Sequence, residues 1–249
     1  MADKPSRALV FYGDGLASLV SASQSNLHSF ASLSSCGFLS LRSPPSQGQS
    51  TLSPPVFVSF WVGFLLRIIA ETDSSELPSQ LFSLLGFSGQ NVLEASEYDL
   101  VFLHITSETS KTLKGKSAID WLDQLVGAIL EIATPGSAVS SRLHLSVVLS
   151  YETSSDRSRI SLVKEMNSDL GLLRPRQSYT MKNGKPLDEI RHDHPMLVAQ
   201  WQDGVTRRDL ANAFTFEEFN KNGGNLAMLA DQFLHEVAFK LWKAPKYGA

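Results

Sequence analysis

Cysteine is almost absent from this sequence, and charged residues are few. Its 249 residues include a single cysteine, Cys36. No internal disulfide can form, so we expect a packing role for Cys36 and a reducing compartment, cytoplasmic or nuclear, for the protein. Charged residues make up 19% of the chain, the net charge is -3 and the isoelectric point is about 6.1. This balance predicts no nucleic acid as a partner.

Long hydrophobic runs and secretion signals are also missing. The longest apolar run, 56–69, contains Gly63 and Arg67 and is shorter than the roughly 20 residues that a membrane span needs. We expect this run to be a buried element. The alternative hypothesis is contact with a membrane. The start of the chain, 1–7, is polar and predicts no secretion.

The known motifs of nucleotide enzymes and common hydrolases do not occur. The sequence has no P-loop, no dinucleotide-binding glycine fingerprint, no nucleophile elbow and no zinc-protease motif. Gly223 and Gly224 precede a helical pattern but lack the spacing of a phosphate-binding loop. These absences exclude the conventional nucleotide-dependent enzymes.

Strand and helix patterns alternate along the chain. A loop is predicted at 42–55, which contains four prolines, and we expect it to be flexible. Apolar runs predict strands at 7–12, 37–41, 98–105, 143–149 and 196–200, and helical spacing predicts helices at 16–33, 76–85, 116–132 and 226–242. The alternation predicts a single α/β domain over 1–249, with a mainly parallel sheet and helices on both faces.

Asp14 is the first candidate site residue. It follows the first predicted strand and lies between Gly13 and Gly15. Ligands bind α/β sheets at the carboxyl ends of parallel strands, where Asp14 would lie. The alternative is a turn residue, because Asp and Gly are standard in turns. His104 and His144 lie inside apolar strands, and we expect both to be hydrogen-bonded core residues.

Several stretches resemble, in the same order, the archaeal-type cofactor-independent phosphoglycerate mutases of the alkaline phosphatase superfamily. They read ALVFYGDGLAS at 8–18, NLHSFASLSSCGFL at 26–39, EYDLVFLHITSETSKTLKGKSAIDWLDQLVGAIL at 97–130, LHLSVVLSYETSS at 143–155, IRHDHPMLVAQW at 190–201 and FTFEEFNKNGGNLAMLADQFL at 214–234. The resemblance covers about two thirds of the chain. It implies an alkaline-phosphatase-like core.

The resemblance also implies a set of metal ligands. Its positions fall on Asp14, Glu108, Glu152 and one of His192 and His194. That set is smaller than the one the family carries, since Asp and His ligands of the family are replaced in the loops at 107–111 and 151–152. No nucleophilic serine can be carried over. From the residues alone, Glu152 is explained as a solvated loop residue, and His192 and His194 as surface residues.

A poor ligand set would leave two divalent metals without charge compensation. The resemblance therefore implies a catalytically degenerate relative without a resident cofactor, which acts as an interaction or scaffold module and has a protein partner. The alternative is a metal-dependent phosphohydrolase or phosphomutase with atypical ligands, in which a single Mg²⁺ or Mn²⁺ completes its shell with water. A phosphorylated small molecule would then be the ligand.

Overall fold

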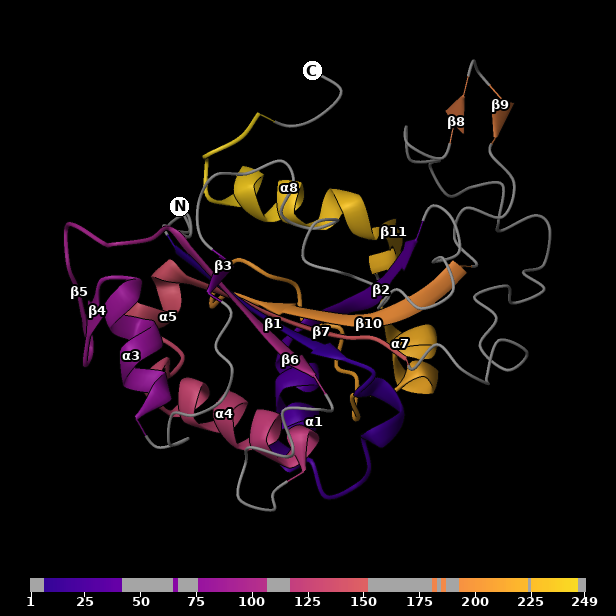
Figure 1. The fold of residues 1–249 in the computed structure, drawn as a ribbon, viewed down its shortest axis with the longest axis horizontal. Helices are drawn as coiled ribbons and strands as arrows, with labels where there is room; N and C mark the ends of the chain where they lie inside the picture. Colours follow the sequence, from indigo (N-terminus) through magenta and orange to yellow (C-terminus); the bar gives the residue numbers. More distant parts are fainter. Residues whose placement is uncertain are drawn as a thin grey trace.

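In the computed structural model, the described residues are 7–41, 65–66, 76–106, 117–151, 181–182, 185–186, 193–223 and 225–245. They form a sheet of seven strands with helices packed on it (Figure 1). The sheet strands are β1 (Arg7–Asp14), β2 (Ser35–Leu41), β3 (Leu65–Leu66), β6 (Leu100–Thr106), β7 (Leu143–Leu149), β10 (Asp193–Trp201) and β11 (Asn225–Leu229).

The helices and the small hairpins complete the described part of the chain. The helices are α1 (Ser25–Leu33), α3 (Leu77–Leu84), α4 (Ala118–Ile132), α5 (Ala138–Arg142), α7 (Phe216–Asn222) and α8 (Ala230–Lys240), with a 3-10 turn η1 (Ala17–Leu19). The hairpins are β4 (Phe87–Ser88) with β5 (Asn91–Val92) and β8 (Met181–Lys182) with β9 (Lys185–Pro186).

The sheet is mainly parallel, which confirms the predicted α/β class. Its strand order is β11-β2-β10-β7-β1-β6-β3. Strand β1 pairs in parallel with β6 and β7, while β10 is antiparallel to both of its neighbours, β2 and β7. The sequence pattern did not predict this reversed strand, because an apolar run shows that a strand is buried and not which way it points.

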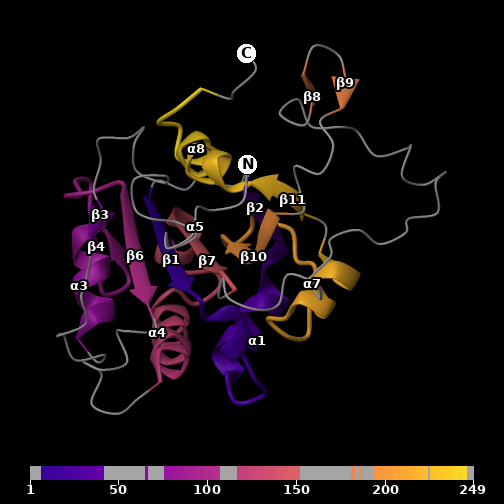
Figure 2. The same ribbon diagram turned by 45° about the vertical axis from the view of Figure 1, so that its right-hand side comes forward.

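Helices cover both faces of the sheet, as predicted. Alternate residues of β1 divide between the faces: Leu9 and Phe11 join the core beneath α1, α3 and α4, whereas Val10 and Tyr12 join the core beneath α8. Figure 2 shows α8 alone above the sheet and α1 and α4 below it.

Two predicted helices are shorter in the structure. The 16–33 segment contains η1, a turn and then α1, because the Gln24 side chain accepts hydrogen bonds from the Ser21 N–H and hydroxyl and fixes a turn before the helix. The predicted helix 226–242 begins only at Ala230, since Asn225–Leu229 pairs with β2 as an edge strand. Tertiary pairing overrides the helical pattern there.

The apolar run at 56–69 is described only at Leu65–Leu66, which pairs with β6 as the edge strand β3. The predicted loop at 42–55 lies outside the described residues. Within the described ranges, no helix has the length and apolar character needed to cross a bilayer.

Candidate functional site at the carboxyl edge of the sheet

Asp14 lies where the carboxyl ends of three neighbouring parallel strands meet. It is the last residue of β1 and pairs with Thr106 at the end of β6, while Gly13 pairs with Leu149 at the end of β7. Gly13 allows close packing, because a Cβ atom there would lie 2.7 Å from the end of the Leu149 side chain. Gly15 adopts a φ of 72°, which suits a residue without a Cβ.

Side chains from β1 and from the residue after β7 hold the Asp14 carboxylate. The Ser150 hydroxyl donates to Asp14 Oδ1 at 2.9 Å and accepts the Gly15 N–H at 2.8 Å. The Tyr12 hydroxyl lies 3.1 Å from the same carboxylate oxygen and 3.2 Å from Ser150 Oγ. One oxygen of Asp14 is thus bound by hydroxyl groups of the protein itself. We call Tyr12, Asp14, His104 and Ser150 the Asp14 cluster.

His104, on β6, completes the Asp14 cluster. Its ring lies 5.1 Å from the Tyr12 ring, and Nε2 is 3.7 Å from Asp14 Oδ2. That distance is too long for a hydrogen bond. Nε2 is buried and has no hydrogen-bond partner. His104 is half-buried and packs against Tyr12, and the prediction that it is hydrogen-bonded is wrong for this nitrogen.

The surroundings of Asp14 favour its charged form. Burial is the largest influence and raises the pKa of the carboxyl group. The interaction with His104 and the hydrogen bonds from Ser150 and Tyr12 lower the pKa and together outweigh burial, so the pKa of Asp14 lies below its usual value. The carboxylate is therefore ionised at neutral pH.

Asp14 is the one predicted metal ligand whose side chain the structure describes. Glu108, Glu152 and His192 lie outside the described residues, and for His194 only the strand backbone is described. His194 is near the start of β10, before Leu197, which pairs with Leu149 at the end of β7. The backbone of His194 therefore enters the sheet at the same edge as Asp14. Among the described residues, no three His, Cys, Asp or Glu side chains form a metal-binding group.

Tyr12 and Ser150 were not predicted as members of this site. Tyr12 is two residues before Asp14, so both side chains project from the same face of β1. Ser150 directly follows the buried strand at Leu143–Leu149. A polar residue just after a predicted parallel strand is the signal that could have placed Ser150 at this edge.

A second polar cluster, defined by His144, Ser146, Gln200 and Lys240, lies between the sheet and α8. Lys240 Nζ donates to Gln200 Oε1 at 3.1 Å, so the amide nitrogen of Gln200 faces His144 Nε2, at 3.3 Å. His144 Nε2 then accepts, and Nδ1 carries the proton. Nδ1 is buried without a hydrogen-bond partner. Burial first, and then the charge of Lys240, hold the pKa of His144 well below its usual value.

Three comparisons with known proteins give little information. No family profile and no curated protein matches the chain. Among solved structures, the PH0037 protein from Pyrococcus horikoshii is similar with a TM-score of 0.49 and 13% sequence identity, and the match covers 100% of both chains. A similarity at this level supports no inference about function.

Proposed function

We propose that this protein is a catalytically degenerate relative of the alkaline phosphatase superfamily that acts as an interaction or scaffold module. The resemblance to phosphoglycerate mutases in the sequence motivates the superfamily. In that resemblance, Asp14 occupies the position of a metal-binding aspartate. The hydrogen bonding of Asp14 motivates the proposed loss of catalysis.

The observation that carries the proposal is the hydrogen bonding of Asp14. Oδ1 receives the Ser150 hydroxyl at 2.9 Å and lies within hydrogen-bond distance of the Tyr12 hydroxyl. A metal ion requires a lone pair of its ligand, and a hydroxyl donor that points at the same oxygen competes for it. Asp14 therefore joins β1 to the residue after β7, and hydroxyl groups of the protein solvate its carboxylate.

His104 supports the alternative, a metal-dependent phosphohydrolase or phosphomutase with atypical ligands. Its Nε2 atom is without a hydrogen-bond partner and faces Asp14 Oδ2 across 3.7 Å. An imidazole nitrogen and a carboxylate oxygen are both common metal ligands, and Mg²⁺ or Mn²⁺ would take the remaining positions from water or substrate. In this alternative the substrate is a phosphorylated small molecule.

Metal titration separates the two proposals. Mn²⁺ and Mg²⁺ are titrated into the wild-type protein and into Asp14→Ala by isothermal titration calorimetry, and hydrolysis of an aryl phosphate is measured with each metal. We expect neither binding nor turnover. Asp99→Ala is the matched control, because Asp99 is a surface carboxylate that pairs with Lys243 before the amino end of β6.

Micromolar metal binding that is lost in Asp14→Ala and kept in Asp99→Ala would overturn the proposal of a catalytically degenerate protein and favour the phosphohydrolase. Mn²⁺-dependent hydrolysis with the same mutational pattern would establish the alternative.

A further inference from the structure

The loop between β10 and α7 exposes apolar and basic side chains. Val205 is 46% exposed and Leu210 is 67% exposed. Arg208, between them, is also exposed and makes no ion pair in the described part of the chain. We call Val205, Arg208 and Leu210 the Leu210 surface.

The loop that carries this surface is fixed to the body of the protein on both sides of Leu210. The Asp209 N–H donates to the Ser34 carbonyl at 3.0 Å, and Asp209 Oδ2 accepts the Cys36 N–H at 2.8 Å. After Leu210, Ala211 and Phe214 are fully buried in the core beneath α1. Leu210 is therefore presented on a rigid support.

Leu210 adopts a backbone conformation that leucine rarely takes. Its φ is 55°, in the left-handed region, where glycine is favoured and a bulky side chain is strained. The side chain gains little packing in return, because most of its surface is exposed. The stability of the free protein gives no reason for leucine at this position, whereas a partner that covers the side chain would.

The charge of the loop indicates what such a partner carries. Both acidic side chains of the loop are engaged within the chain: Asp203 accepts the Gly136 N–H, and Asp209 accepts the Cys36 N–H and pairs with Arg207. The positive charge of Arg208 is left facing solvent. A partner that covers Leu210 would complement Arg208 with acidic side chains.

We propose that the Leu210 surface binds a protein segment in which acidic side chains flank an apolar one, with Leu210 as the apolar anchor. This inference rests on the proposed function as an interaction module and assigns that interaction to one surface. Its failure would leave the metal titration unaffected, because the titration tests Asp14 at a different place.

Leu210→Gly distinguishes a binding role from a structural one. Glycine takes the left-handed conformation without strain and removes the side chain. A binding role predicts an unchanged or higher melting temperature together with weaker binding. Arg208→Glu tests the charge, Lys221→Glu is the control for a charge reversal elsewhere on the surface, and Leu19→Ser is the control for an exposed leucine on η1.

Binding is measured with the full chain and short synthetic peptides that carry leucine or phenylalanine between glutamates. Matched peptides carry glutamine in place of glutamate. We expect binding of the acidic peptides that weakens with added salt and falls on the order of tenfold in Leu210→Gly and in Arg208→Glu, with both controls unchanged.

Several results would overturn the proposal. They are absence of peptide binding, equal binding of the glutamine peptides, wild-type affinity in both test variants, and a lower melting temperature for Leu210→Gly. A wild-type dimer that Leu210→Gly dissociates in analytical ultracentrifugation would replace the partner with a second copy of this chain.

Discussion

Asp14 couples the stability of the protein to pH. Its pKa is lower in the folded protein than in the unfolded chain, even though burial alone would raise it. The ionised carboxylate therefore stabilises the fold above the unfolded pKa, near 4, and this contribution is lost as the pH falls through the folded pKa. We predict that Asp14→Asn lowers the free energy of unfolding by about 2 kcal/mol at neutral pH.

Urea unfolding from neutral to acid pH measures this effect. The difference between the wild-type protein and Asp14→Asn should shrink as the pH falls, because the wild-type carboxyl group becomes protonated. Asp99→Asn is the control, since its exposed pair with Lys243 contributes little. A constant difference across the pH range would show that the charge of Asp14 is not what stabilises the fold.

Cys36 should be chemically inert in the native protein. It is fully buried on β2, and its thiol donates to the Ala31 carbonyl at 3.4 Å. Burial first, and then the negative charge of Asp209, raise the pKa of the thiol to about 12. We predict that a thiol reagent at mildly alkaline pH labels Cys36 only as fast as the protein opens. Rapid labelling that urea does not accelerate would contradict this prediction.

The sequence predicted where the Asp14 cluster lies, but not the contacts within it. Asp14 was placed at the carboxyl edge because the strand and the Asp-Gly turn are local patterns. The hydrogen bond to Ser150 joins residues that are 136 positions apart. Such a contact depends on the pairing of β1 with β7, which no local pattern specifies.

Helix α1 begins against a carboxylate from another helix. Asp123, on α4, is almost fully buried, and its Oδ1 accepts the Leu27 N–H in the first turn of α1 at 2.8 Å. Its Oδ2 accepts the Asn26 side-chain N–H at 2.9 Å. The first N–H groups of a helix lack partners within the helix, and a carboxylate satisfies them and suits the helix dipole. Asp123 thus joins the two helices.

We predict that Asp123→Ala lowers the free energy of unfolding by about 3 kcal/mol, because it leaves the Leu27 N–H buried without its acceptor. Asp123→Asn should cost less, since its amide oxygen still accepts that N–H. Asp120→Ala, which removes the bond from the Gln24 side chain at a more exposed position, is the matched control and should be the mildest change. Chemical denaturation of the three variants checks this order, and equal losses would contradict it.

Predicted elements agree with the structure where the apolar pattern of the segment itself determines its conformation. The strand at 143–149 has the predicted bounds, and α4 begins two residues inside the predicted 116–132. The segment at 226–229 was predicted as helix because its apolar residues continue the pattern of α8, yet its backbone pairs with the free edge of β2. An available sheet edge is a property of the fold, so the sequence of the segment cannot show it.

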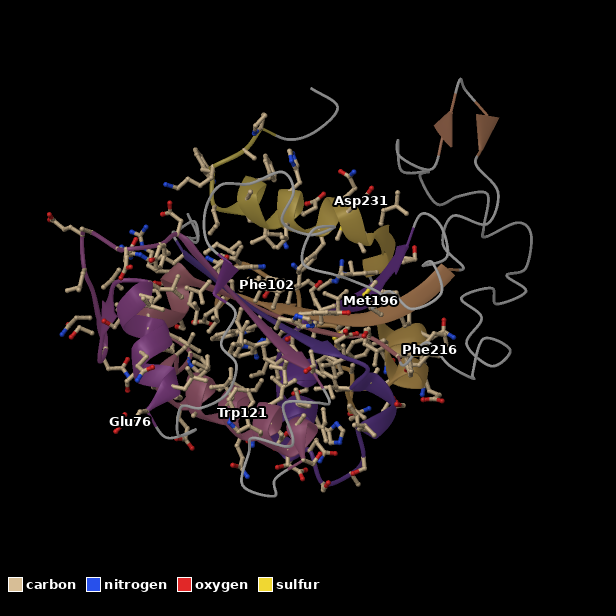
Figure 3. All side chains as sticks on the ribbon, viewed as in Figure 1. Glu76, Phe102, Trp121, Met196, Phe216 and Asp231 are labelled. Carbon is tan, nitrogen blue, oxygen red and sulfur yellow. The ribbon has the colours of Figure 1, made fainter. Side chains whose placement is uncertain are left out.

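The α/β class could be predicted for the whole molecule. Both faces of a mainly parallel sheet must be covered by apolar side chains, and strand and helix patterns with apolar faces recur along the entire chain. Phe102 and Met196 lie on the sheet towards α8, whereas Trp121 lies on the opposite side (Figure 3). The covering by α8 is not entirely apolar. The cluster of His144, Ser146, Gln200 and Lys240 lies beneath this helix, and one of its buried donors is unsatisfied.

The polar cluster beneath α8 predicts that this helix separates from the sheet before the rest of the molecule unfolds. An unsatisfied buried N–H and a half-buried lysine both gain hydration when the helix opens, which lowers the free energy of opening. The pKa of Lys240 is lowered, chiefly by burial, so its charge opposes the closed state. Native-state hydrogen exchange should therefore show faster exchange for the amides of α8 than for those of β1 and β7.

Two variants test whether α8 opens as a separate unit. Phe233→Ala removes a fully buried ring of α8 and should accelerate exchange in α8 by an amount that corresponds to about 3 kcal/mol. Phe30→Ala, the matched change on α1, should leave the local opening of α8 unchanged, although it destabilises the molecule as a whole. If both variants accelerate exchange equally in α8 and in β1, the helix and the sheet unfold together, and the polar cluster has no separate effect on the helix that covers it.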